Sequence, residues 1–381
     1  MTEQRSSGRS RRRVLAVGGA ALAGVTGLAG CTGSGGSADG NNSGQQGTDG
    51  GSDADSTTGS AATTESGGST ASDETTGGSG SNELTVFHAG SLAPPFEAAE
   101  TQFEAEFGAQ VAREAKGSVG STKKITEEGR RASVLGVSDF RLLRDMLLPD
   151  YGDWYSVFAT NAMTITYTEN STGADEVGPD NWWEVLGRDD VTFAHSDPAV
   201  DPNGYRSVMT MKLGAMAFEG ETLYDESTAD ALVEKARIPS GTETELLAQL
   251  QTGKLDYAWQ YQSAGATRDV QTIDLQPAVD LSQATQQYAD HYAQAEVETE
   301  SGTFTGAPIA YGLTVPSVAP NPELGAQWLE FMLTEPGEQI LKDAGFEPVQ
   351  PAVVPEGAQD AVPERVMENA EARSSLGPLE L

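Results

Sequence analysis

The sequence predicts an α/β fold in which parallel β-sheets are covered by helices. Segments with the alternating apolar pattern of strands are followed, several times, by segments with apolar residues at helical spacing. The turns between them are rich in Gly, Ser and Asn. Once the N-terminal region is set aside, roughly 300 residues remain, which is enough for two lobes with cores of their own.

Residues 1–31 have the features of an export signal. Consecutive arginines at 11–13 give the twin-arginine arrangement, and the apolar stretch at 14–29 is too short for a membrane span. The stretch ends in LAGC, which resembles the lipobox of lipoproteins, so we expect Cys31 to be a lipid anchor. The alternative is a cleaved signal in which Cys31 is incidental. Both predict export, and the first places the protein on the extracellular face of the membrane.

Residues 32–82 are expected to form a disordered tether. The segment consists of Gly, Ser, Thr, Asp and Asn with almost no large apolar side chain, as in GSGGSADGNNSGQQGTDGG. Such a composition buries too little apolar surface to offset the conformational entropy lost on ordering.

The remaining segments alternate between strand and helix. The segment LTVFHAG at 84–90 has the strand pattern, and the next places Phe96, Ala99, Phe103 and Phe107 at helical spacing. Three further strand–helix pairs are expected: a strand at 109–118 with a helix at 121–132, a strand at 132–139 with a helix at 141–150, and a strand at 191–198 with a helix at 204–220. A helix at 243–253 then precedes a strand at 254–263. In such sheets, ligand sites lie beyond the C-terminal ends of the strands.

Four turns that precede expected helices share one chemistry. They are Gly90-Ser91, Gly117-Ser118, Asn203-Gly204 and the turn at 240–242. Helix N-termini expose unpaired backbone N–H groups and the positive end of the helix dipole, so several of them converging on a cleft would bind an anion without lysine. For any one turn, ordinary helix capping is the alternative interpretation.

The charge balance excludes a nucleic-acid-binding protein. The chain has 23 Lys and Arg against 57 Asp and Glu, a formal net charge of -34. The acidic residues lie mostly on expected solvated helix faces such as EAAETQFEAEF. We interpret this as the surface of a halophilic protein, kept soluble by its charge, and the alternative is that the acidity attracts a cationic ligand.

Five segments, in order, resemble the archaeal tungstate/molybdate-binding proteins of ABC importers, which have the type II periplasmic-binding-protein fold. They are VFHAGSL, KGSVGSTKKI, SDPAVDPNGYRS, ETELLAQLQTGKLDYAWQYQS and APIAYGLTVP, and the resemblance extends from residue 84 to about 351. It implies two α/β lobes joined by two crossover strands, near 157–166 and near 259–266. The first lobe would then comprise 83–160 and 265–381, and the second 161–264.

The resemblance also implies the site. A single oxyanion would be bound by Ser91, Ser118, the backbone N–H of Asn203 and Tyr261. No cofactor is implied, since the oxyanion is the transported ligand. The expected partners are a membrane permease and its ATPase, with the receptor a monomer.

Two carboxylates, Asp201 and Glu243, are implied as ligands of the metal centre. Thr242 and Glu245 have the spacing of a capping box, which would leave Glu243 free to point into the cleft. Ser240 and Glu243 have the same spacing, so Glu245 remains the alternative carboxylate. A Mo(VI) or W(VI) centre can expand from four to six oxygen ligands, whereas sulfate would be repelled by two carboxylates.

The expected function is therefore capture of tungstate or molybdate outside the cell, without catalysis. One alternative is a receptor for sulfate or phosphate on the same fold. Another is an extracellular hydrolase that uses Ser91, but HAGSL lacks the G-x-S-x-G turn, and His88 lies in the preceding strand. The three histidines, His88, His195 and His291, lack the spacing of a zinc site, and the first two are expected to pack at strand ends.

Two further groups of residues have more than one interpretation. Arg206, next to the Asn-Gly turn, would either neutralise the region of Asp201 or form a surface ion pair. We expect Trp182, Trp183 and Trp259 to belong to the core, which argues against a carbohydrate-binding platform.

The lipobox generates a first prediction. Cys31→Ser should release the protein into the medium and leave oxyanion binding unchanged, because residues 32–82 serve only as a tether. Cell fractionation followed by immunoblotting checks this. Persistence of the variant in the membrane fraction would contradict the assignment of Cys31 as the anchor.

Overall fold

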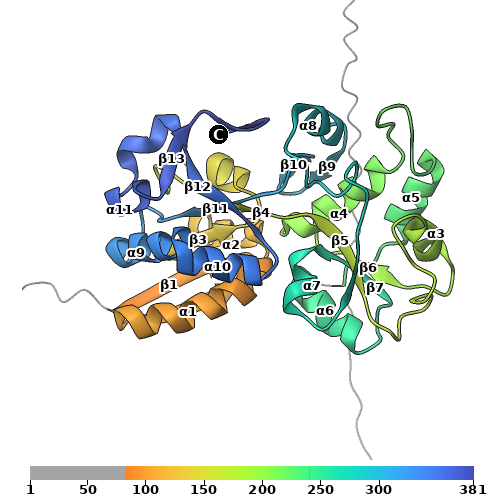
Figure 1. Ribbon diagram of the computed structural model, residues 1–381, viewed down its shortest axis with the longest axis horizontal. Helices are drawn as coiled ribbons and strands as arrows, with labels where there is room; N and C mark the ends of the chain where they lie inside the picture. The colour runs from red at the N-terminus through yellow and green to blue at the C-terminus, as the bar shows by residue number, and fades with distance from the viewer. Residues whose placement is uncertain (1–81, 240) are drawn as a thin grey trace, which may run out of the picture. The chain divides into compact units, whose positions relative to one another are not determined.

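The computed structural model describes residues 82–239 and 241–381. The expected export signal, Cys31 and nearly all of the expected tether lie outside these ranges. The described chain contains a seven-stranded and a four-stranded sheet, each with helices packed against it, which confirms the predicted α/β fold (Figure 1). We call the part built on the seven-stranded sheet lobe 1 and the part built on the four-stranded sheet lobe 2. No helix in the described ranges is long and apolar enough to cross a membrane.

Lobe 1 is built from both ends of the described chain. Its sheet has the order β13-β12-β4-β11-β3-β1-β2, in which β1 runs parallel to β2 and β3, while β11 is antiparallel to β3 and β4. Its strands are β1 (Glu83–His88), β2 (Gln110–Ala115), β3 (Val134–Val137), β4 (Ser156–Thr160), β11 (Ala310–Thr314), β12 (Glu347–Pro355) and β13 (Ala370–Arg373). Its helices are α1 (Ala93–Phe107), α2 (Ser118–Thr126), α9 (Pro322–Leu333), α10 (Glu335–Asp343) and α11 (Glu364–Met367). Three short helical segments are η1 (Gly90–Leu92), η2 (Leu143–Leu147) and η3 (Glu356–Ala361). Two short antiparallel strands, β14 (Ser375–Leu376) and β15 (Leu379–Glu380), end the chain described.

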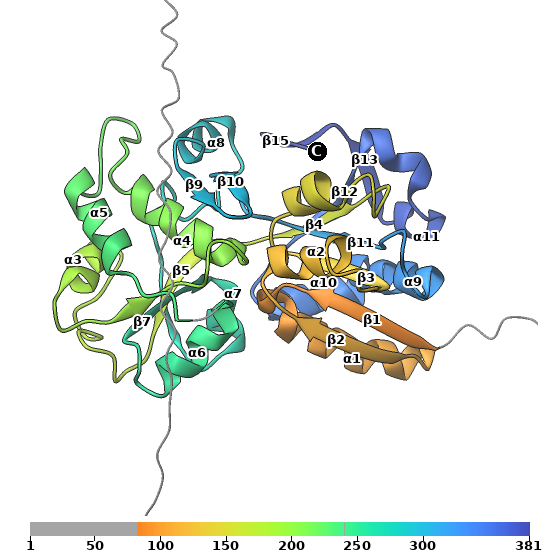
Figure 2. The same cartoon turned by 180° about the vertical axis from the view of Figure 1, so that it is seen from behind.

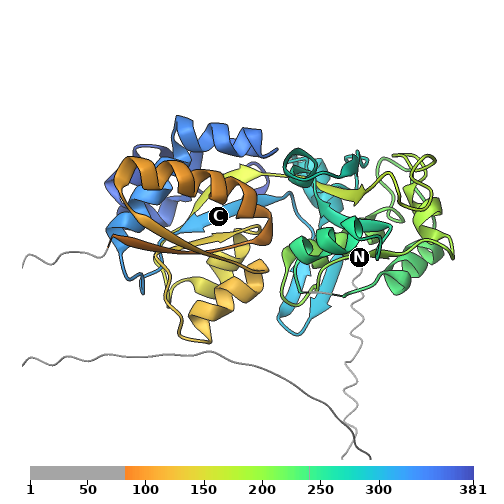
Figure 3. The same cartoon turned by 90° about the horizontal axis from the view of Figure 1, so that it is seen from below.

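Strand β1 shows why its sequence forms a strand buried on both faces. Leu84 and Val86 pack in the core that contains Phe96 of α1, whereas Phe87 packs in a second core with Ile125 of α2. Successive side chains of a strand point to opposite faces, so LTVF serves two layers at once. The helices α1 and α2 accordingly lie on opposite sides of the sheet, as the views from behind and from below show (Figure 2, Figure 3).

Lobe 2 carries the helices on which most of the expected site depends. Its sheet has the order β6-β7-β5-β8. Its strands are β5 (Met163–Tyr167), β6 (Phe193–Ala194), β7 (Tyr257–Tyr261) and β8 (Gln271–Ile273), and its helices are α3 (Trp182–Gly187), α4 (Pro202–Leu213), α5 (Glu226–Lys235), α6 (Glu243–Gln251) and α7 (Ser263–Thr267). The chain then forms α8 (Gln286–Tyr292) and the hairpin β9 (Glu296–Thr299) and β10 (Gly302–Thr305).

The tryptophans of lobe 2 belong to its core, as expected. Trp182 and Trp259 are fully buried and meet edge to face, with ring centroids 5.5 Å apart. Trp183 is partly buried and packs against the same core, at 5.6 Å from Trp182. Edge-to-face pairs of this kind stabilise a core beyond the burial of their area.

The chain passes between the lobes at one expected and one unexpected place. It leaves lobe 1 through Asn161 and Ala162, between β4 and β5, within the expected crossover at 157–166. The return was expected near 259–266, but there the chain forms the end of β7 and then α7. It adds β8 to the sheet of lobe 2, and re-enters lobe 1 only at β11, after residues 274–309. Lobe 2 is therefore longer than expected, because β8 pairs with β5 across a separation in sequence that no local pattern encodes.

Turns from the two lobes contact each other at two places. Gly117, just before α2, lies against the turn before α4, and a Cβ atom on Gly117 would be 2.3 Å from the carbonyl oxygen of Val200. The backbone N–H of Gly120 donates a hydrogen bond of 3.2 Å to the same oxygen. Similarly, a Cβ atom on Gly90 would be 2.6 Å from Oγ1 of Thr244 at the start of α6. Glycine at these positions permits the contact because a side chain would hold the turns apart.

Gly117→Ala tests this contact. The backbone of Gly117 (φ -54°, ψ 141°) is allowed for alanine, so we expect the unfolding temperature to change little. The added methyl group should push the Val200 carbonyl away, and the Gly120 amide should then exchange with solvent faster, while Glu127, which is bonded within lobe 1, keeps its protection. Residue-resolved hydrogen exchange measures both.

Gly357→Ala is the matched control, because a Cβ atom there meets nothing within 4 Å. Unchanged Gly120 exchange in Gly117→Ala would show that the two turns do not make the contact in solution.

Candidate functional site

The structure brings N-terminal helix ends together near the expected turns, although Asn203 and Gly204 lie inside the first turn of α4 and do not precede it as expected. Ser91 lies in η1, which leads directly into α1, and Ser118 is the first residue of α2. Asn203 is the second residue of α4, and Glu243 is the first residue of α6. Helix α6 contacts η1, and the turn before α4 contacts the turn before α2, so N-terminal helix ends from both lobes face each other.

Asp201 joins two of these helix ends. It is the N-cap of α4 and is almost completely buried, with 1% of its surface exposed. Its Oδ1 accepts a hydrogen bond from the backbone N–H of Asn203 (3.2 Å), and its Oδ2 accepts one from the backbone N–H of Glu243 (3.1 Å). The Asn203 N–H, which the resemblance assigns to the bound oxyanion, thus donates to the Asp201 carboxylate in this structure.

Glu243 lies beside Asp201 in the interior. It is 3% exposed, whereas Glu245, the alternative carboxylate, is exposed to solvent. Burial raises the pKa of Glu243 well above its usual value, and the adjacent Asp201 carboxylate raises it further, against the opposing effect of the Ser91 backbone N–H. Among the described residues, Oε2 of Glu243 has no hydrogen-bond partner. Two acidic side chains therefore share a desolvated position that disfavours two negative charges.

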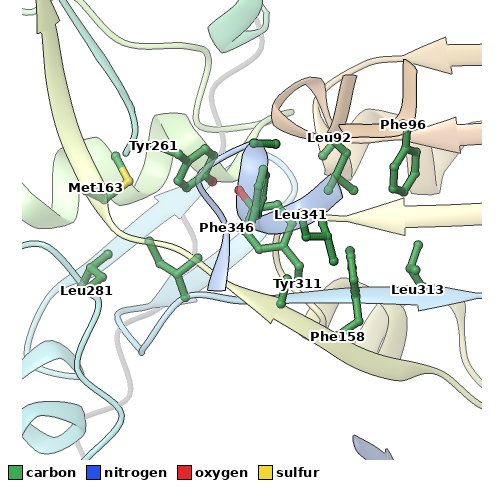
Figure 4. Packing of buried hydrophobic residues seen from close by; sticks show 14 of the residues in the cluster. Leu92, Phe96, Phe158, Met163, Tyr261, Leu281, Tyr311, Leu313, Leu341 and Phe346 are labelled. Atoms are coloured by element: carbon green, nitrogen blue, oxygen red, sulfur yellow. The ribbon is translucent and has the colours of Figure 1, made fainter. Parts of the chain in front are cut away.

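Ser91 and Tyr261 border a small cavity with Glu243. The cavity has a volume of about 20 Å³, and its other lining residues include Gln260, Ser263 and Arg268. The hydroxyl of Tyr311, from β11, donates a hydrogen bond of 3.0 Å to Oγ of Ser91. Tyr311 and Tyr261 come from different lobes, and their rings lie 5.9 Å apart beside Phe346 (Figure 4).

Ser118 does not line this cavity, but hydrogen bonds connect it through Ser138 to Tyr261, which does. The Ser118 Oγ accepts a hydrogen bond from the backbone N–H of Ser138 (3.0 Å), and the two hydroxyl oxygens are also 3.0 Å apart. The Tyr261 hydroxyl in turn donates to the Ser138 Oγ at 3.4 Å. A chain of hydroxyl groups therefore connects α2, the end of β3 and β7.

Arg206 pairs with a different carboxylate from those considered in the sequence. It is 2% exposed, so it forms no surface ion pair, and its Nη2 lies 3.3 Å from Oδ2 of Asp139 rather than near Asp201. Its Nη1 donates to the Ser138 carbonyl (2.7 Å) and to the Tyr261 hydroxyl (2.9 Å). Both expectations for Arg206 are corrected, because Asp139, two residues after the end of β3 in lobe 1, lies against α4 and pairs with it.

Asp139 is held in its ionised form by several partners. Burial opposes its ionisation, but the guanidinium groups of Arg141 and Arg206 outweigh that effect and hold the pKa of Asp139 well below its usual range. The Tyr205 hydroxyl also donates to its Oδ2, at 2.7 Å. Since Tyr205 and Arg206 belong to α4, this buried cluster fastens lobe 2 to lobe 1.

Sequence reasoning missed Ser138, Asp139, Tyr205 and Tyr311. A signal existed for the first two, because VLGVSD places a Ser-Asp pair at the C-terminal end of a strand parallel to β1, where ligand sites gather. For Tyr311 there was none, since AYGLT reads as an ordinary buried strand.

Two of the three histidines are buried at strand ends, as expected. His88 is buried at the end of β1, with Nδ1 2.7 Å from the carbonyl of Ala89 and its ring against Phe96. His195 makes the corresponding contact with the carbonyl of Ser196. No hydrogen bond in the described chain joins a histidine to Ser91, and no cluster of three His, Cys, Asp or Glu side chains suited to a metal ion occurs in residues 82–239 and 241–381.

Comparison with known proteins identifies the family to which this sequence is similar. The family model of bacterial extracellular solute-binding proteins matches residues 84–347. An uncharacterized solute-binding protein of Methanoculleus marisnigri is 38% identical over 317 residues, covering 77% of this chain and 88% of that protein. The molybdate/tungstate-binding protein WtpA of Thermococcus kodakarensis is 37% identical over 316 residues, covering 76% and 88%.

A solved structure agrees on the fold. The sulfate-binding protein SubI of Mycobacterium tuberculosis superposes with a TM-score of 0.52 at 16% identity, covering 74% of this chain and 92% of that chain. Family match and sequence identity over most of both chains thus agree with the two-lobed α/β structure. The chain belongs to the family of bacterial extracellular solute-binding proteins.

Proposed function

We propose that this protein captures tungstate or molybdate between its two lobes and delivers it to an ABC permease and its ATPase, without a catalytic step. The observation that carries the proposal is the buried pair formed by Asp201 and Glu243 at the N-terminal ends of α4 and α6. These two acids lie among hydrogen-bond donors that would by themselves suit an ordinary anion, so the ligand must also suit the acids.

Two carboxylates oppose the binding of an ordinary tetrahedral anion. Like charges about 4 Å apart repel by about 4 kcal/mol at an effective dielectric constant of 20. Sulfate and phosphate offer no centre at which a carboxylate oxygen can bind. The hexavalent metal of tungstate or molybdate is large and can accept additional oxygen ligands, so the carboxylates of Asp201 and Glu243 would complete its coordination.

The groups around the acids are suited to the oxo groups of such an ion. The hydroxyls of Ser91 and Tyr261 border the cavity. The Ser118 hydroxyl is connected to that of Tyr261 through the hydroxyl of Ser138. In the described part of the chain, Nδ2 of buried Asn203 also has no hydrogen-bond partner. A buried unpaired donor or acceptor costs roughly 1–3 kcal/mol. The free Asn203 amide therefore favours a ligand that offers an acceptor oxygen, and the free Glu243 Oε2 favours one that offers a metal centre to bind.

The donor groups also argue against a simple metal cation as the ligand. A bare cation would need only oxygen ligands, and N-terminal helix ends with their partial positive charge would repel it. A metal oxyanion would bind both kinds of group, because the carboxylates can bind its metal and the hydrogen-bond donors can bind its oxygens. Relatives named as molybdate/tungstate-binding, at 36–37% identity, support the same ligand class.

The cellular setting follows from the sequence. We propose twin-arginine export, lipid anchoring at Cys31 and action as a monomer on the extracellular face of the membrane. A formal net charge of -34 would repel an anionic ligand in dilute buffer. We propose that the protein works in concentrated salt, where the Debye length is only about 3 Å at 1 M and this repulsion is screened.

The carboxylates provide the sharpest test of the ligand. The double variant Asp201→Asn, Glu243→Gln retains shape and the capping ability of residue 201 but removes both anionic ligands. Tungstate affinity should fall at least about tenfold, or 1.4 kcal/mol, whereas sulfate should bind no worse than to wild type because the repulsion is gone. Titration calorimetry with tungstate, molybdate, sulfate and phosphate at the same molar salt measures these affinities.

Glu245→Gln serves as the control, because this exposed side chain lies in the same helical turn as Glu243. It should change none of the four affinities. An unchanged tungstate-to-sulfate ratio in the double variant would falsify the assignment of Asp201 and Glu243 as ligands. Preferential binding of sulfate or phosphate by wild type would instead support a different oxyanion receptor.

The serines provide a second test. Ser91→Ala and Ser118→Ala should each weaken tungstate binding by about 0.5–3 kcal/mol, the range for losing a hydrogen bond to a charged group. The same proteins should be assayed with ester substrates and by mass spectrometry for covalent adducts. Ester turnover abolished by Ser91→Ala, or an adduct on Ser91, would indicate a hydrolase.

A further inference from the structure

Each of the three proposed ligand-binding hydroxyls accepts a hydrogen bond from a donor behind it. Ser91 accepts from the Tyr311 hydroxyl, Ser118 from the Ser138 backbone N–H, and Tyr261 from Arg206. A hydroxyl has one hydrogen and two lone pairs, so occupation of a lone pair by a donor constrains where its own hydrogen points. Two of these hydroxyls, those of Ser91 and Tyr261, line the same cavity, which suggests a common role for the donors behind them.

Arg206 is the strongest of these donors. A guanidinium group has no acceptor, so the 2.9 Å contact between Nη1 and the Tyr261 oxygen can only be a bond that Tyr261 accepts. The hydroxyl hydrogen of Tyr261 is thereby turned away from Arg206. Within residues 82–239 and 241–381, this hydrogen has one acceptor, the Ser138 Oγ at 3.4 Å. That contact is long, which leaves the hydrogen available to a ligand oxygen.

Arg206 is itself fixed in place by lobe 1. It donates to the Ser138 carbonyl at 2.7 Å and pairs with Asp139, while Tyr205 holds the same Asp139 carboxylate. Since it is 2% exposed, its charge is poorly screened by water. A buried guanidinium strengthens the acidity of the hydroxyl that it contacts, which makes Tyr261 a better donor to an anion.

Tyr311 donates to the Ser91 hydroxyl in the way that Arg206 donates to Tyr261. Its hydroxyl donates to Ser91 Oγ at 3.0 Å, and Nδ2 of Asn161 approaches the Tyr311 oxygen from the other side at 3.5 Å. The Tyr311 ring is locked edge to face against Phe346 and Phe158, at centroid distances of 5.2 Å and 6.4 Å. Its direction is therefore set by packing, and the Ser91 hydrogen is left to point elsewhere.

We propose that Arg206 and Tyr311 are positioning residues that orient the hydroxyls of Tyr261 and Ser91 as donors toward the bound oxyanion. This inference rests on the proposed function and extends it, because it explains why the hydroxyls present hydrogens, rather than lone pairs, beside two acidic side chains. Arg206 touches the anion only through Tyr261, and Tyr311 only through Ser91.

Two double-mutant cycles test the proposal on the full-length protein with tungstate as the probe. One combines Arg206→Lys with Tyr261→Phe, and the other combines Tyr311→Phe with Ser91→Ala. Each positioning variant alone should weaken tungstate binding about 3- to 30-fold. In the background that lacks its target hydroxyl, the same substitution should have little further effect on affinity.

Crossed pairs supply the control. Arg206→Lys with Ser91→Ala and Tyr205→Phe with Tyr261→Phe combine residues that share no hydrogen bond in the structure, and their effects should add. Tyr205→Phe removes a bond to Asp139 but none to Tyr261, so it reports what loosening of the buried cluster does by itself. Unfolding temperatures of all variants show whether each remains folded.

A merely structural role would lower the unfolding temperature and weaken binding equally in both backgrounds. Additive cycles for Arg206 with Tyr261 and for Tyr311 with Ser91 would therefore overturn the proposal. If Arg206→Lys fails to fold, the cycle of Tyr311 decides, because Tyr311→Phe keeps the buried ring. A wild-type protein that binds neither tungstate nor molybdate would overturn the proposed function and this inference together, whereas binding with additive cycles would overturn the inference alone.

Discussion

The structure depends on how two acids are kept side by side in its interior. Asp201 and Glu243 lie at the first turns of α4 and α6, where the positive ends of the helix dipoles and the backbone N–H groups of Asn203, Glu243 and Ser91 favour negative charge. Burial and mutual repulsion oppose it, as the raised pKa of Glu243 indicates. Such a pair is costly unless a partner supplies positive charge. The hexavalent metal of the proposed ligand, with its expandable coordination, would supply that charge, and its oxo groups would accept from the surrounding donors.

The approach of the lobes completes this environment. Glycines at 90 and 117 allow turns from lobe 1 to lie against the starts of α6 and α4, and the buried ion pair of Arg206 with Asp139 holds α4 to the end of β3. Removal of one partner from such a buried pair typically costs about 3–5 kcal/mol, because the other charge is left uncompensated. The same guanidinium that joins the lobes also donates a hydrogen bond to Tyr261, so the contact between the lobes and the proposed orientation of the Tyr261 hydroxyl involve one side chain.

Local patterns in the sequence predict much of this architecture. The strand β1 and the helices α1, α4 and α6 follow from apolar periodicity, and the turns that begin the helices follow from their Gly, Ser and Asn residues. The return to lobe 1 was misplaced because β8 joins its sheet by a distant pairing with β5. The partner of Arg206 could not be read from its neighbours, since Asp139 lies 67 positions earlier and meets it only across the lobes. The assignment of ligand roles to the site residues came from resemblance, and the structure supplies their mutual geometry.

Everything proposed for the ligand depends on whether the carboxylates of Asp201 and Glu243 bind its metal. X-ray absorption spectroscopy of the tungsten edge, on the protein loaded with tungstate in molar salt, tests it most directly. If both carboxylates bind the metal, tungsten bound to wild type should be six-coordinate, with two longer oxygen ligands that are lost in Asp201→Asn, Glu243→Gln. A bound tungsten with four oxygen ligands at a single distance, unchanged by that substitution, would contradict it.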